Sequence, residues 1–296
     1  TRQEFMRKYE LIAAAGVAPY DEDHTYPGLR GSTRRMLYNL MGFLRARDSV
    51  EATARGTLTG SKMDQFASFK HEHLMRQKAK GGGGPVANYE ELREVCEPAV
   101  PLLERLMRAI VAAAGLDPSE RRMYKGKPLP LDAHHCPGVF FDALTMGPLK
   151  SRRRCDEKVA NEYGGEYDCI VDCVRCSVVV DTEDQLVSVA SKLSSMGVPL
   201  EAASQPPPVA DGNDDGKLPN FIVARLKNRY TAPLFNGYRD ALYNIVVDGG
   251  KGAWVICEVQ LHLAAVLSHK EILHKYYEVG PPGGLTRCSP TPRPAA

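Results

Sequence analysis

The sequence predicts an α+β protein in which a helical N-terminal region precedes a β-sheet that helices flank. In the first half of the chain, apolar residues recur at spacings of three and four, which is typical of amphipathic helices. Between residues 220 and 261, three runs alternate apolar and polar residues and are joined by Asn-Gly and Asp-Gly-Gly turns. This alternation is typical of adjacent strands in a sheet that is covered on one face.

The composition is that of an ordinary globular protein. The chain has 296 residues, of which 43% are apolar and 25% charged, and its net charge is +2. A charge so close to zero gives no reason to expect binding to nucleic acid or to a membrane surface. No apolar run approaches the roughly 20 residues that span a bilayer, and no charged-then-apolar leader opens the chain.

The eight cysteines fit small buried apolar residues, because a chain of this size can build a core without disulfides. We therefore expect a soluble protein of a reducing compartment, either the cytoplasm or an organelle interior. A zinc cluster of Cys169, Cys173 and Cys176 is disfavoured. On one strand the first two would share a face, while Cys176 would point the other way.

The first half is expected to be helical at residues 5–15, 36–44, 70–80 and 89–114. The glycine run 81–84 is the best linker in the chain. We therefore expect a helical N-terminal region at 1–84, a second domain with a leading helix at 85–280, and a flexible tail at 281–296. The metal-binding residue types at 132–136 have no recognisable ligand spacing, and we expect a loop there.

The second half alternates helices and strands. Helices are expected at residues 150–163, 182–196 and 263–279, and strands at 167–181, 220–230, 241–247 and 253–261. The acidic segment 211–216 resembles the start of a calcium loop. Its twelfth position is Ile222 instead of glutamate, which favours a surface loop.

Charged residues on the expected strands suggest a site. Spacing by two places Arg225, Lys227 and Arg229 on one face of their strand, and Glu258, Gln260 and His262 on one face of theirs. A cationic row beside a carboxylate row predicts a site for a phosphorylated ligand and its metal, although an exposed sheet face would also accommodate these residues.

Asp172 is the second metal candidate beside Glu258. It interrupts a β-branched run, and burying an acid there is costly unless a metal or a cation binds it.

Four motifs in this order resemble the synthetase domain of the RelA/SpoT family, whose members make the alarmone (p)ppGpp. They are Arg225-x-Lys227, Asn236-Gly237-Tyr238, Glu258-x-Gln260-x-His262 and His274-Lys275-x-Tyr277. The resemblance covers about residues 148–279, and the His-Asp motif of the family's hydrolase half is missing from the sequence. It implies a nucleotidyltransferase-like mixed sheet flanked by helices. It also implies transfer of the β,γ-pyrophosphate of ATP to the 3′-hydroxyl of GDP or GTP, with Mg2+.

The resemblance also assigns roles to residues. Glu258 would hold magnesium and help to deprotonate the hydroxyl, with Asp172 as the second metal ligand, and Tyr238 would stack on guanine. The remaining nucleotide-binding candidates are Lys150, Arg152, Arg154, Lys158, Arg225, Lys227, Asn236, Gln260 and His262.

Four positions depart from the family pattern. Ile170 stands where the family has its magnesium aspartate, five residues before Arg175, and Pro148 stands where it has an adenine-stacking arginine. Arg152, Arg153 or Arg154 could replace that arginine through cation–π stacking. In addition, Arg239-Asp240 follows Tyr238 in place of Gln-Ser.

These departures keep two alternatives open. One is an inactive synthetase-like fold that serves as a nucleotide-binding or scaffold subunit of a larger assembly. The other is an enzyme whose acceptor is ATP or an RNA end. The sequence leaves a homo-oligomer open as well.

Overall fold

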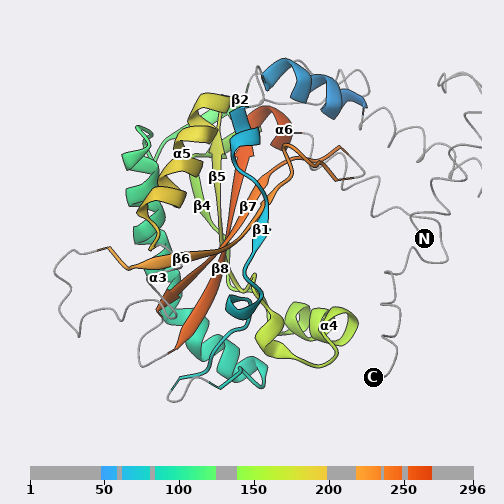
Figure 1. The fold of residues 1–296 in the computed structure, drawn as a ribbon, viewed down its shortest axis with the longest axis vertical. Coiled ribbons are helices and arrows are strands. Elements are labelled where there is room, and N and C mark those ends of the chain that lie inside the picture. Colours follow the sequence, from blue (N-terminus) through green and yellow to red (C-terminus); the bar gives the residue numbers. More distant parts are fainter. Residues whose placement is uncertain are drawn as a thin grey trace, which may run out of the picture.

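The computed structural model describes residues 48–58, 62–80, 84–124, 139–198, 218–234, 237–248 and 253–268. Its centre is a six-stranded sheet with the strand order β1-β6-β7-β8-β5-β4, and a separate hairpin pairs β2 with β3 (Figure 1). The strands are β1 (Phe69–Lys70), β2 (Arg121–Tyr124), β3 (Val139–Asp142), β4 (Leu144–Met146), β5 (Val174–Val180), β6 (Phe221–Asn228), β7 (Ala241–Asp248) and β8 (Trp254–Leu263).

The sheet is mixed, because β5 and β8 run parallel while the other neighbouring strands run antiparallel. The helices are α3 (Tyr89–Ala113), α4 (Arg152–Glu162), α5 (Glu183–Met196) and α6 (Ala264–Leu267), with a further helix at 48–57. Three short 3-10 helices are η1 (Lys62–Gln65), η2 (Glu72–Leu74) and η3 (Tyr167–Cys169). The predicted α+β fold with a mixed sheet is confirmed.

Helices α3 and α5 cover one face of the sheet (Figure 1). Leu103 and Ile110 of α3, Leu186 of α5, and Tyr243 and Ile245 of β7 are fully buried members of one core. Burial of side chains of this size stabilises a fold by about 1.5–3 kcal/mol each. This core fixes the backbone of the sheet and leaves its other face to carry the polar residues.

The opposite face is covered at one end by the segment that contains η2. Leu74 and Met75 pack there with Ile222 of β6, Val246 of β7 and Ile256 of β8. The rest of this face carries charged side chains, so the cover ends where the candidate site begins.

Several elements lie close to their predicted positions. The helices expected at 89–114, 150–163 and 182–196, and the strands expected at 220–230 and 241–247, match α3, α4, α5, β6 and β7. Helix α5 begins with a capping box in which Thr182 and Gln185 bind each other's backbone. The strand expected at 253–261 continues to residue 263 as β8.

Two predictions of secondary structure were wrong. Residues 70–80 form the end of β1, η2 and an extended stretch instead of a basic helix, because Lys78 pairs with Trp254 across the start of β8. Residues 167–173 form η3 and a loop instead of strand. There the backbone amide of Gln77 donates to the Asp168 carbonyl and its side chain donates to the Ile170 carbonyl. These carbonyls are therefore not available for pairing with a neighbouring strand.

Residues 5–15, 36–44, 132–136, 211–216 and 281–296 lie outside the described residues, as does most of 263–279. The boundary expected at residue 84 remains a prediction, and β1, which precedes it, pairs with β6 at the edge of the sheet. Among the described residues, no helix combines the length and apolar character that a bilayer span requires.

Gln77 provides a test of how the segment 71–80 is attached. The side chain is fully buried, donates to the carbonyls of Ile170 (2.9 Å) and Ile256 (3.1 Å), and accepts from the Ile256 amide (2.8 Å). Gln77→Ala leaves these buried backbone groups unpaired, and we expect the free energy of unfolding in urea to fall by about 3 kcal/mol. Gln65→Ala, which removes an exposed side chain from η1, should change it by less than about 0.5 kcal/mol. Equal effects of the two substitutions would contradict the role of Gln77.

Candidate functional site

One row of side chains crosses the open face of the sheet. The strand register places Arg175 of β5 beside Glu258 of β8, Glu258 beside Asn244 of β7, and Asn244 beside Arg225 of β6. Lys70 of β1 pairs with Arg225 and ends the row. Since residues in register on neighbouring strands project to the same side of a sheet, a carboxylate lies here between cationic groups.

Asp172 approaches this row from the loop between η3 and β5. Its Oδ2 accepts hydrogen bonds from Lys150 Nζ (2.5 Å) and Lys158 Nζ (2.9 Å). Burial alone would raise the pKa of Asp172, but the charges and hydrogen bonds of Lys158 and Lys150 outweigh it, and the pKa is lowered. Oδ1 is buried and has no hydrogen-bond partner among the described residues. Asp172 is therefore an ionised carboxylate with one unused oxygen.

Glu258 is the second carboxylate of the site. Burial raises its pKa first, and the negative charge of Asp172 raises it further, while a hydrogen bond from Gln260 opposes the shift. The effect of Asp172 on the pKa of Glu258 indicates that the two carboxylates interact electrostatically. Divalent cations such as magnesium take oxygen ligands, and two buried carboxylates, one with an oxygen that has no partner among the described residues, offer such ligands. Asp172 and Glu258 are the residues that could hold it.

A cationic row, Arg225, Lys227 and Arg229, lies on β6 and directly after its end. Arg225 donates from Nε to Asn244 Oδ1 (2.8 Å), and Arg229 binds Asp240 (2.7 Å). Burial lowers the pKa of Lys227, and the positive charges of Arg225 and Arg229 lower it further. Such crowding of like charges is unfavourable without an anion, so an anionic ligand would stabilise this edge of the site.

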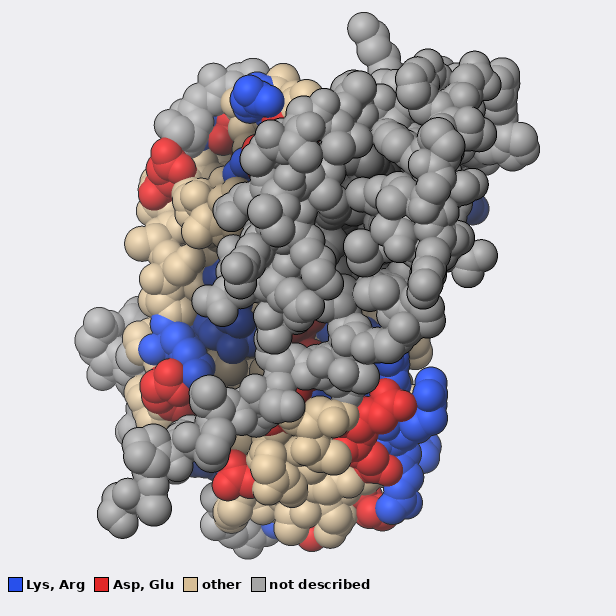
Figure 2. All heavy atoms as spheres, turned by 90° about the vertical axis from the view of Figure 1, so that its right-hand side faces the viewer, with Lys and Arg blue, Asp and Glu red and all other residues tan. Residues whose placement is uncertain are grey.

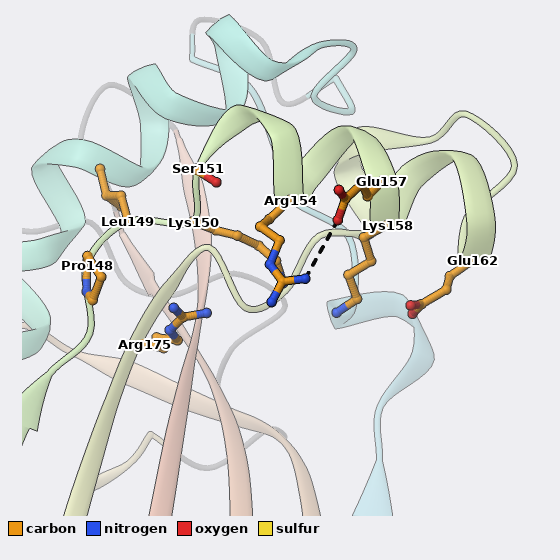
Figure 3. A pocket seen from close by; sticks show the side chains of 9 residues that line it. All are labelled: Pro148, Leu149, Lys150, Ser151, Arg154, Glu157, Lys158, Glu162 and Arg175. Carbon is orange, nitrogen blue, oxygen red and sulfur yellow. Dashed lines mark ion pairs between the residues drawn. The ribbon is translucent and has the colours of Figure 1, made fainter. Parts of the chain in front are cut away.

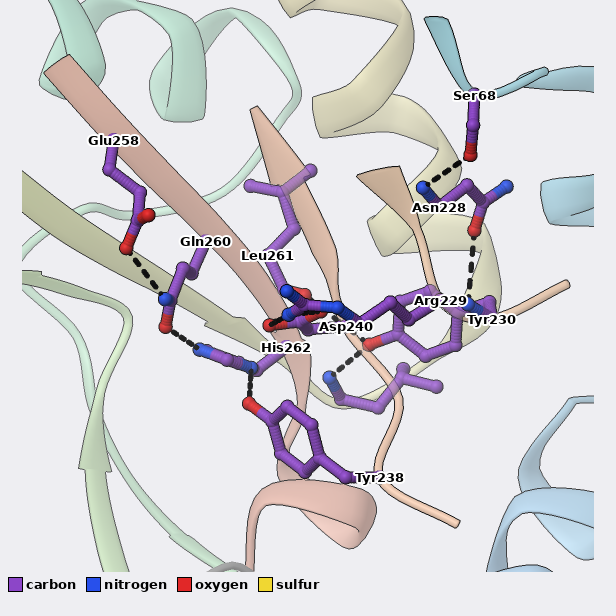
Figure 4. Close-up of polar contacts among 11 residues, drawn as sticks. Ser68, Asn228, Arg229, Tyr230, Tyr238, Asp240, Glu258, Gln260, Leu261 and His262 are labelled. Atoms are coloured by element: carbon purple, nitrogen blue, oxygen red, sulfur yellow. Dashed lines mark hydrogen bonds and ion pairs between the residues drawn. The ribbon is translucent and has the colours of Figure 1, made fainter. Parts of the chain in front are cut away.

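A chain of hydrogen bonds runs along β8 from Glu258 to the loop before β7 (Figure 4). Gln260 Nε2 donates to Glu258 Oε1 (2.8 Å), and Gln260 Oε1 lies 3.2 Å from His262 Nε2. Because that amide oxygen can only accept, His262 Nε2 carries a proton, and in the neutral ring Nδ1 accepts from the Tyr238 hydroxyl (3.2 Å). The chain fixes the orientation of Glu258. It also holds Tyr238, which is only 8% exposed.

A pocket of about 430 Å³ opens beside Asp172, between α4 and the start of β5 (Figure 3). It is lined by Pro148, Leu149, Lys150, Ser151, Arg154, Glu157, Lys158, Glu162 and Arg175. Four of these side chains are cationic and two are acidic, and Arg154 pairs with Glu157 at 3.7 Å. A Cβ atom at Gly147 would lie 2.8 Å from Arg175 Cγ, so glycine is what lets the Arg175 side chain cross this position. The pocket is thus suited to an anion such as a polyphosphate.

The arginines on the outer surface of α4 are less available to a ligand than those in the pocket, because they already form closer ion pairs. Arg152 pairs with Glu90 of α3 (2.5 Å), its guanidinium lies 5.7 Å from the centre of the Tyr89 ring, and Arg153 pairs with Glu157. Figure 2 shows acidic and basic side chains next to each other in the lower part of that view, where α4 lies. Of the two arginines of α4 that were predicted to bind nucleotide, Arg154 lines the pocket, whereas Arg152 lies against α3.

The structure gathers most of the predicted site residues. Lys150, Lys158, Asp172 and Glu258 lie at the pocket and the row, and Arg225, Lys227, Tyr238, Gln260 and His262 lie along β6 to β8. Asn236 lies outside the described residues. Ile170, at the family's aspartate position, is fully buried in the core, while Asp172 presents the carboxylate.

Two residues of the site were missing from the predicted set. Arg175 was identified only as a marker of its strand, and Asn244 was not identified at all. The signal for Asn244 was its amide inside an apolar strand, which is the same kind of signal that drew attention to Asp172.

Other candidate metal ligands do not extend the site. Within the described part of the chain, Glu166, Asp168 and Cys169 place ligand atoms within 4.8 Å of one another. Arg76 binds both of these carboxylates, at 2.8 and 3.0 Å. Cys173 and Cys176 are not part of this group of described residues.

Comparisons with known proteins give matches among solved structures. No family model and no curated protein matches the chain. Small alarmone synthetase 1 from Bacillus subtilis, bound to its product pppGpp, matches with 15% identity and a TM-score of 0.42, over 65% of this chain and 82% of that one. A GTP pyrophosphokinase family protein from Streptococcus pneumoniae matches with 17% identity and a TM-score of 0.38, over 65% and 76%.

The complex between the Type VI effector Tas1 and its immunity protein matches with 16% identity and a TM-score of 0.36, over 65% of this chain and 74% of that one. These TM-scores are all below 0.5. We therefore base the proposed function on the side chains of the site.

Asp172→Asn is expected to destabilise the protein by about 2 kcal/mol at pH 7, because Lys150 and Lys158 lose their counter-charge in a site that is only partly exposed. Since the folded pKa of Asp172 is lowered, its contribution is complete above the ordinary value of 3.8 and is lost as the pH falls through the lowered pKa. Thermal unfolding between pH 3 and 7 measures this difference. Asp184→Asn, which removes the exposed partner of Lys62, is the control and should change little. A constant difference at all pH values would contradict the assignment.

Glu258→Gln is expected to stabilise the protein, in contrast to Asp172→Asn. Without divalent ions, removing this buried charge should raise the free energy of unfolding at pH 7 by about 0.5–2 kcal/mol, and the amide oxygen still accepts from Gln260. Because the folded pKa of Glu258 is raised, protonation of Glu258 removes its unfavourable charge from the wild type as the pH falls. The stability advantage of the Glu258→Gln variant over wild type therefore disappears as the pH approaches the ordinary value of 4.5. Melting curves of the variant and of wild type in EDTA, recorded at several pH values, measure this stability difference. Loss of stability at pH 7 would refute the proposed repulsion.

Proposed function

We propose that the protein transfers the β,γ-pyrophosphate of ATP to the 3′-hydroxyl of GDP or GTP with magnesium. The observation that supports this most is the buried Oδ1 of Asp172, which has no hydrogen-bond partner among the described residues, on a carboxylate whose charge raises the pKa of Glu258 and whose two lysine partners line a cationic pocket. Phosphoryl transfer needs little protein chemistry beyond positioned carboxylates for a divalent ion and cations around the phosphates.

The pocket beside α4 is the proposed place of the ATP phosphates. Lys150, Arg154, Lys158 and Arg175 bring four positive charges to its lining. Lys150 and Lys158 already bind Asp172, so a triphosphate would share these lysines with that carboxylate. Arginine fits phosphate oxygens in pairs, whereas lysine acts as a point charge, and the pocket offers both.

Asp172 and Glu258 would hold the magnesium ion, which would neutralise negative charge on the transferred phosphates. Glu258 has a second part in the proposal. Its raised pKa makes it a better proton acceptor for the attacking hydroxyl than an exposed glutamate, and Gln260 fixes the carboxylate orientation.

The proposed reaction is a single displacement. The acceptor 3′-oxygen forms a bond to the β-phosphorus while the bond from that phosphorus to the α,β-bridging oxygen breaks. The hydroxyl proton passes to Glu258, and AMP leaves with the electron pair of the broken bond.

The acceptor would lie toward β6 and β7, where Arg225 and Lys227 provide positive charge for its phosphates. Tyr238 would stack on the guanine. Since Tyr238 is 8% exposed and its hydroxyl is bound to His262, stacking requires a shift of the loop that carries it. The assignments of Asn236 and His262 to nucleotide binding remain predictions.

The same geometry supports a second candidate function. Both pocket lysines are engaged by Asp172, and Tyr238 is buried, which suits an inactive fold that binds a nucleotide or serves as a subunit of a larger assembly. In that case nucleotides would bind without transfer.

An assay with labelled ATP and GDP, GTP or GMP, with and without magnesium, tests the proposal. We expect magnesium-dependent formation of a pyrophosphorylated nucleotide. Glu258→Gln should lower its rate by about 10²–10⁴-fold, the usual contribution of a general base. Glu97→Gln, at an exposed position of α3, is the matched control and should leave the rate unchanged.

The outcomes of this assay separate the candidates. Nucleotide binding without product supports the inactive fold, and product formed from ATP alone supports a different acceptor. If no product forms and Glu258→Gln leaves nucleotide binding unchanged, the proposed function is wrong.

A further inference from the structure

We propose that Asn244 is a positioning residue that fixes the loop of Asp172 relative to Arg225, an inference that rests on the proposed function of this site. Asn244 lies in the middle of β7, in register with Glu258 on one side and Arg225 on the other. It is 0% exposed. An amide side chain at such a place must have partners, because burying it without hydrogen bonds is costly.

Both polar atoms of Asn244 have partners on different elements. Oδ1 accepts from Arg225 Nε (2.8 Å), and Nδ2 donates to the carbonyl of Val171 (3.2 Å). Val171 directly precedes Asp172 in the chain. One side chain thus joins the proposed metal-binding loop to an arginine of the cationic row.

The loop of residues 170–173 is held at three of its carbonyls. Gln77 binds that of Ile170 (2.9 Å), Asn244 binds that of Val171, and the Lys150 amide binds that of Cys173 (3.2 Å). Of these three anchors, Gln77 also binds the backbone of β8 and Lys150 also binds Asp172 itself. Asn244 is the anchor that also binds the cationic row. Its loss would disturb the two sides of the site together.

The chemistry of the amide explains why this position needs asparagine. Aspartate keeps the acceptor for Arg225 but has no donor for the Val171 carbonyl, and leucine has neither. Because Asn244 occupies Nε of Arg225, the terminal guanidinium nitrogens are what that arginine offers to a phosphate. Residues that orient a metal ligand without touching the metal commonly change metal affinity by about 10–100-fold when they are replaced.

Asn228 supplies a matched control on the neighbouring strand. It is also an asparagine and is 1% exposed, and its Nδ2 donates to the carbonyls of Met63 (2.8 Å) and Phe66 (2.9 Å), away from the site. Asn244→Leu and Asn228→Leu remove buried amides of the same kind. Asn244→Ser and Asn228→Ser are a second pair in case a leucine variant does not fold.

The experiment measures Mn2+ binding by the electron paramagnetic resonance of the free ion, together with amide hydrogen exchange of residues 170–173 and the product assay. We expect the Asn244 variants to bind Mn2+ about 10–100-fold more weakly than wild type and to exchange faster in this segment. The Asn228 variants should lose stability without either change. In the product assay, the fold decrease in kcat should be larger than the fold increase in KM for ATP.

The inference is overturned if Mn2+ affinity in the Asn244 variants stays within about twofold of wild type, if the Asn228 variants weaken it equally, or if wild type binds no Mn2+. A wild-type protein that makes no product but binds Mn2+ in an Asn244-dependent manner would refute the proposed function and uphold the inference.

Discussion

The site depends on the balance of charge around Asp172. Two lysines bind one oxygen of this carboxylate, the other oxygen is buried, and the negative charge of Asp172 raises the pKa of Glu258. Removing charges from water is costly, so this arrangement persists only because the lysines compensate Asp172 and the fold holds Glu258 in place. The protein thus lowers the pKa of one carboxylate and raises the pKa of the other, with the difference set by their neighbours.

The backbone that carries Asp172 is fixed by residues that are distant in sequence. Gln77 and Asn244, which belong to different segments of the chain, bind consecutive carbonyls of the loop, and both are fully buried. The segment of Gln77 lies before the glycine run, so part of the N-terminal region supports the site although the family resemblance does not include it. Arg239 extends this support at the other end of the sheet, where it binds Glu51 of the helix at 48–57 (2.8 Å).

The parts of the fold that were predictable from the sequence are those with a strong repeat. The alternation in β6 and β7 and the apolar stripe of α5 identified these elements close to their true ends. The loop of Asp172 was predicted as strand because residues 167–181 form an apolar run rich in valine, although Asp168 and Asp172 interrupt it. Their backbone bonds instead go to Gln77 and Asn244, and local sequence carries no signal for such distant partners. In the same way, the basic residues of 70–80 suggested a helix, while the pairing of Lys78 with Trp254 decided the conformation.

The parallel pair β5 and β8 has a consequence for how the protein reaches its folded state. These two strands are neighbours within the sheet, yet α5, β6 and β7 separate them along the chain. Contacts between segments so far apart form late, because closing a long loop must precede the gain from pairing. During synthesis, Asp172 leaves the ribosome well before Glu258 does. The compensation by Lys150 and Lys158, which lie nearby in sequence, is therefore available to Asp172 long before the second carboxylate arrives.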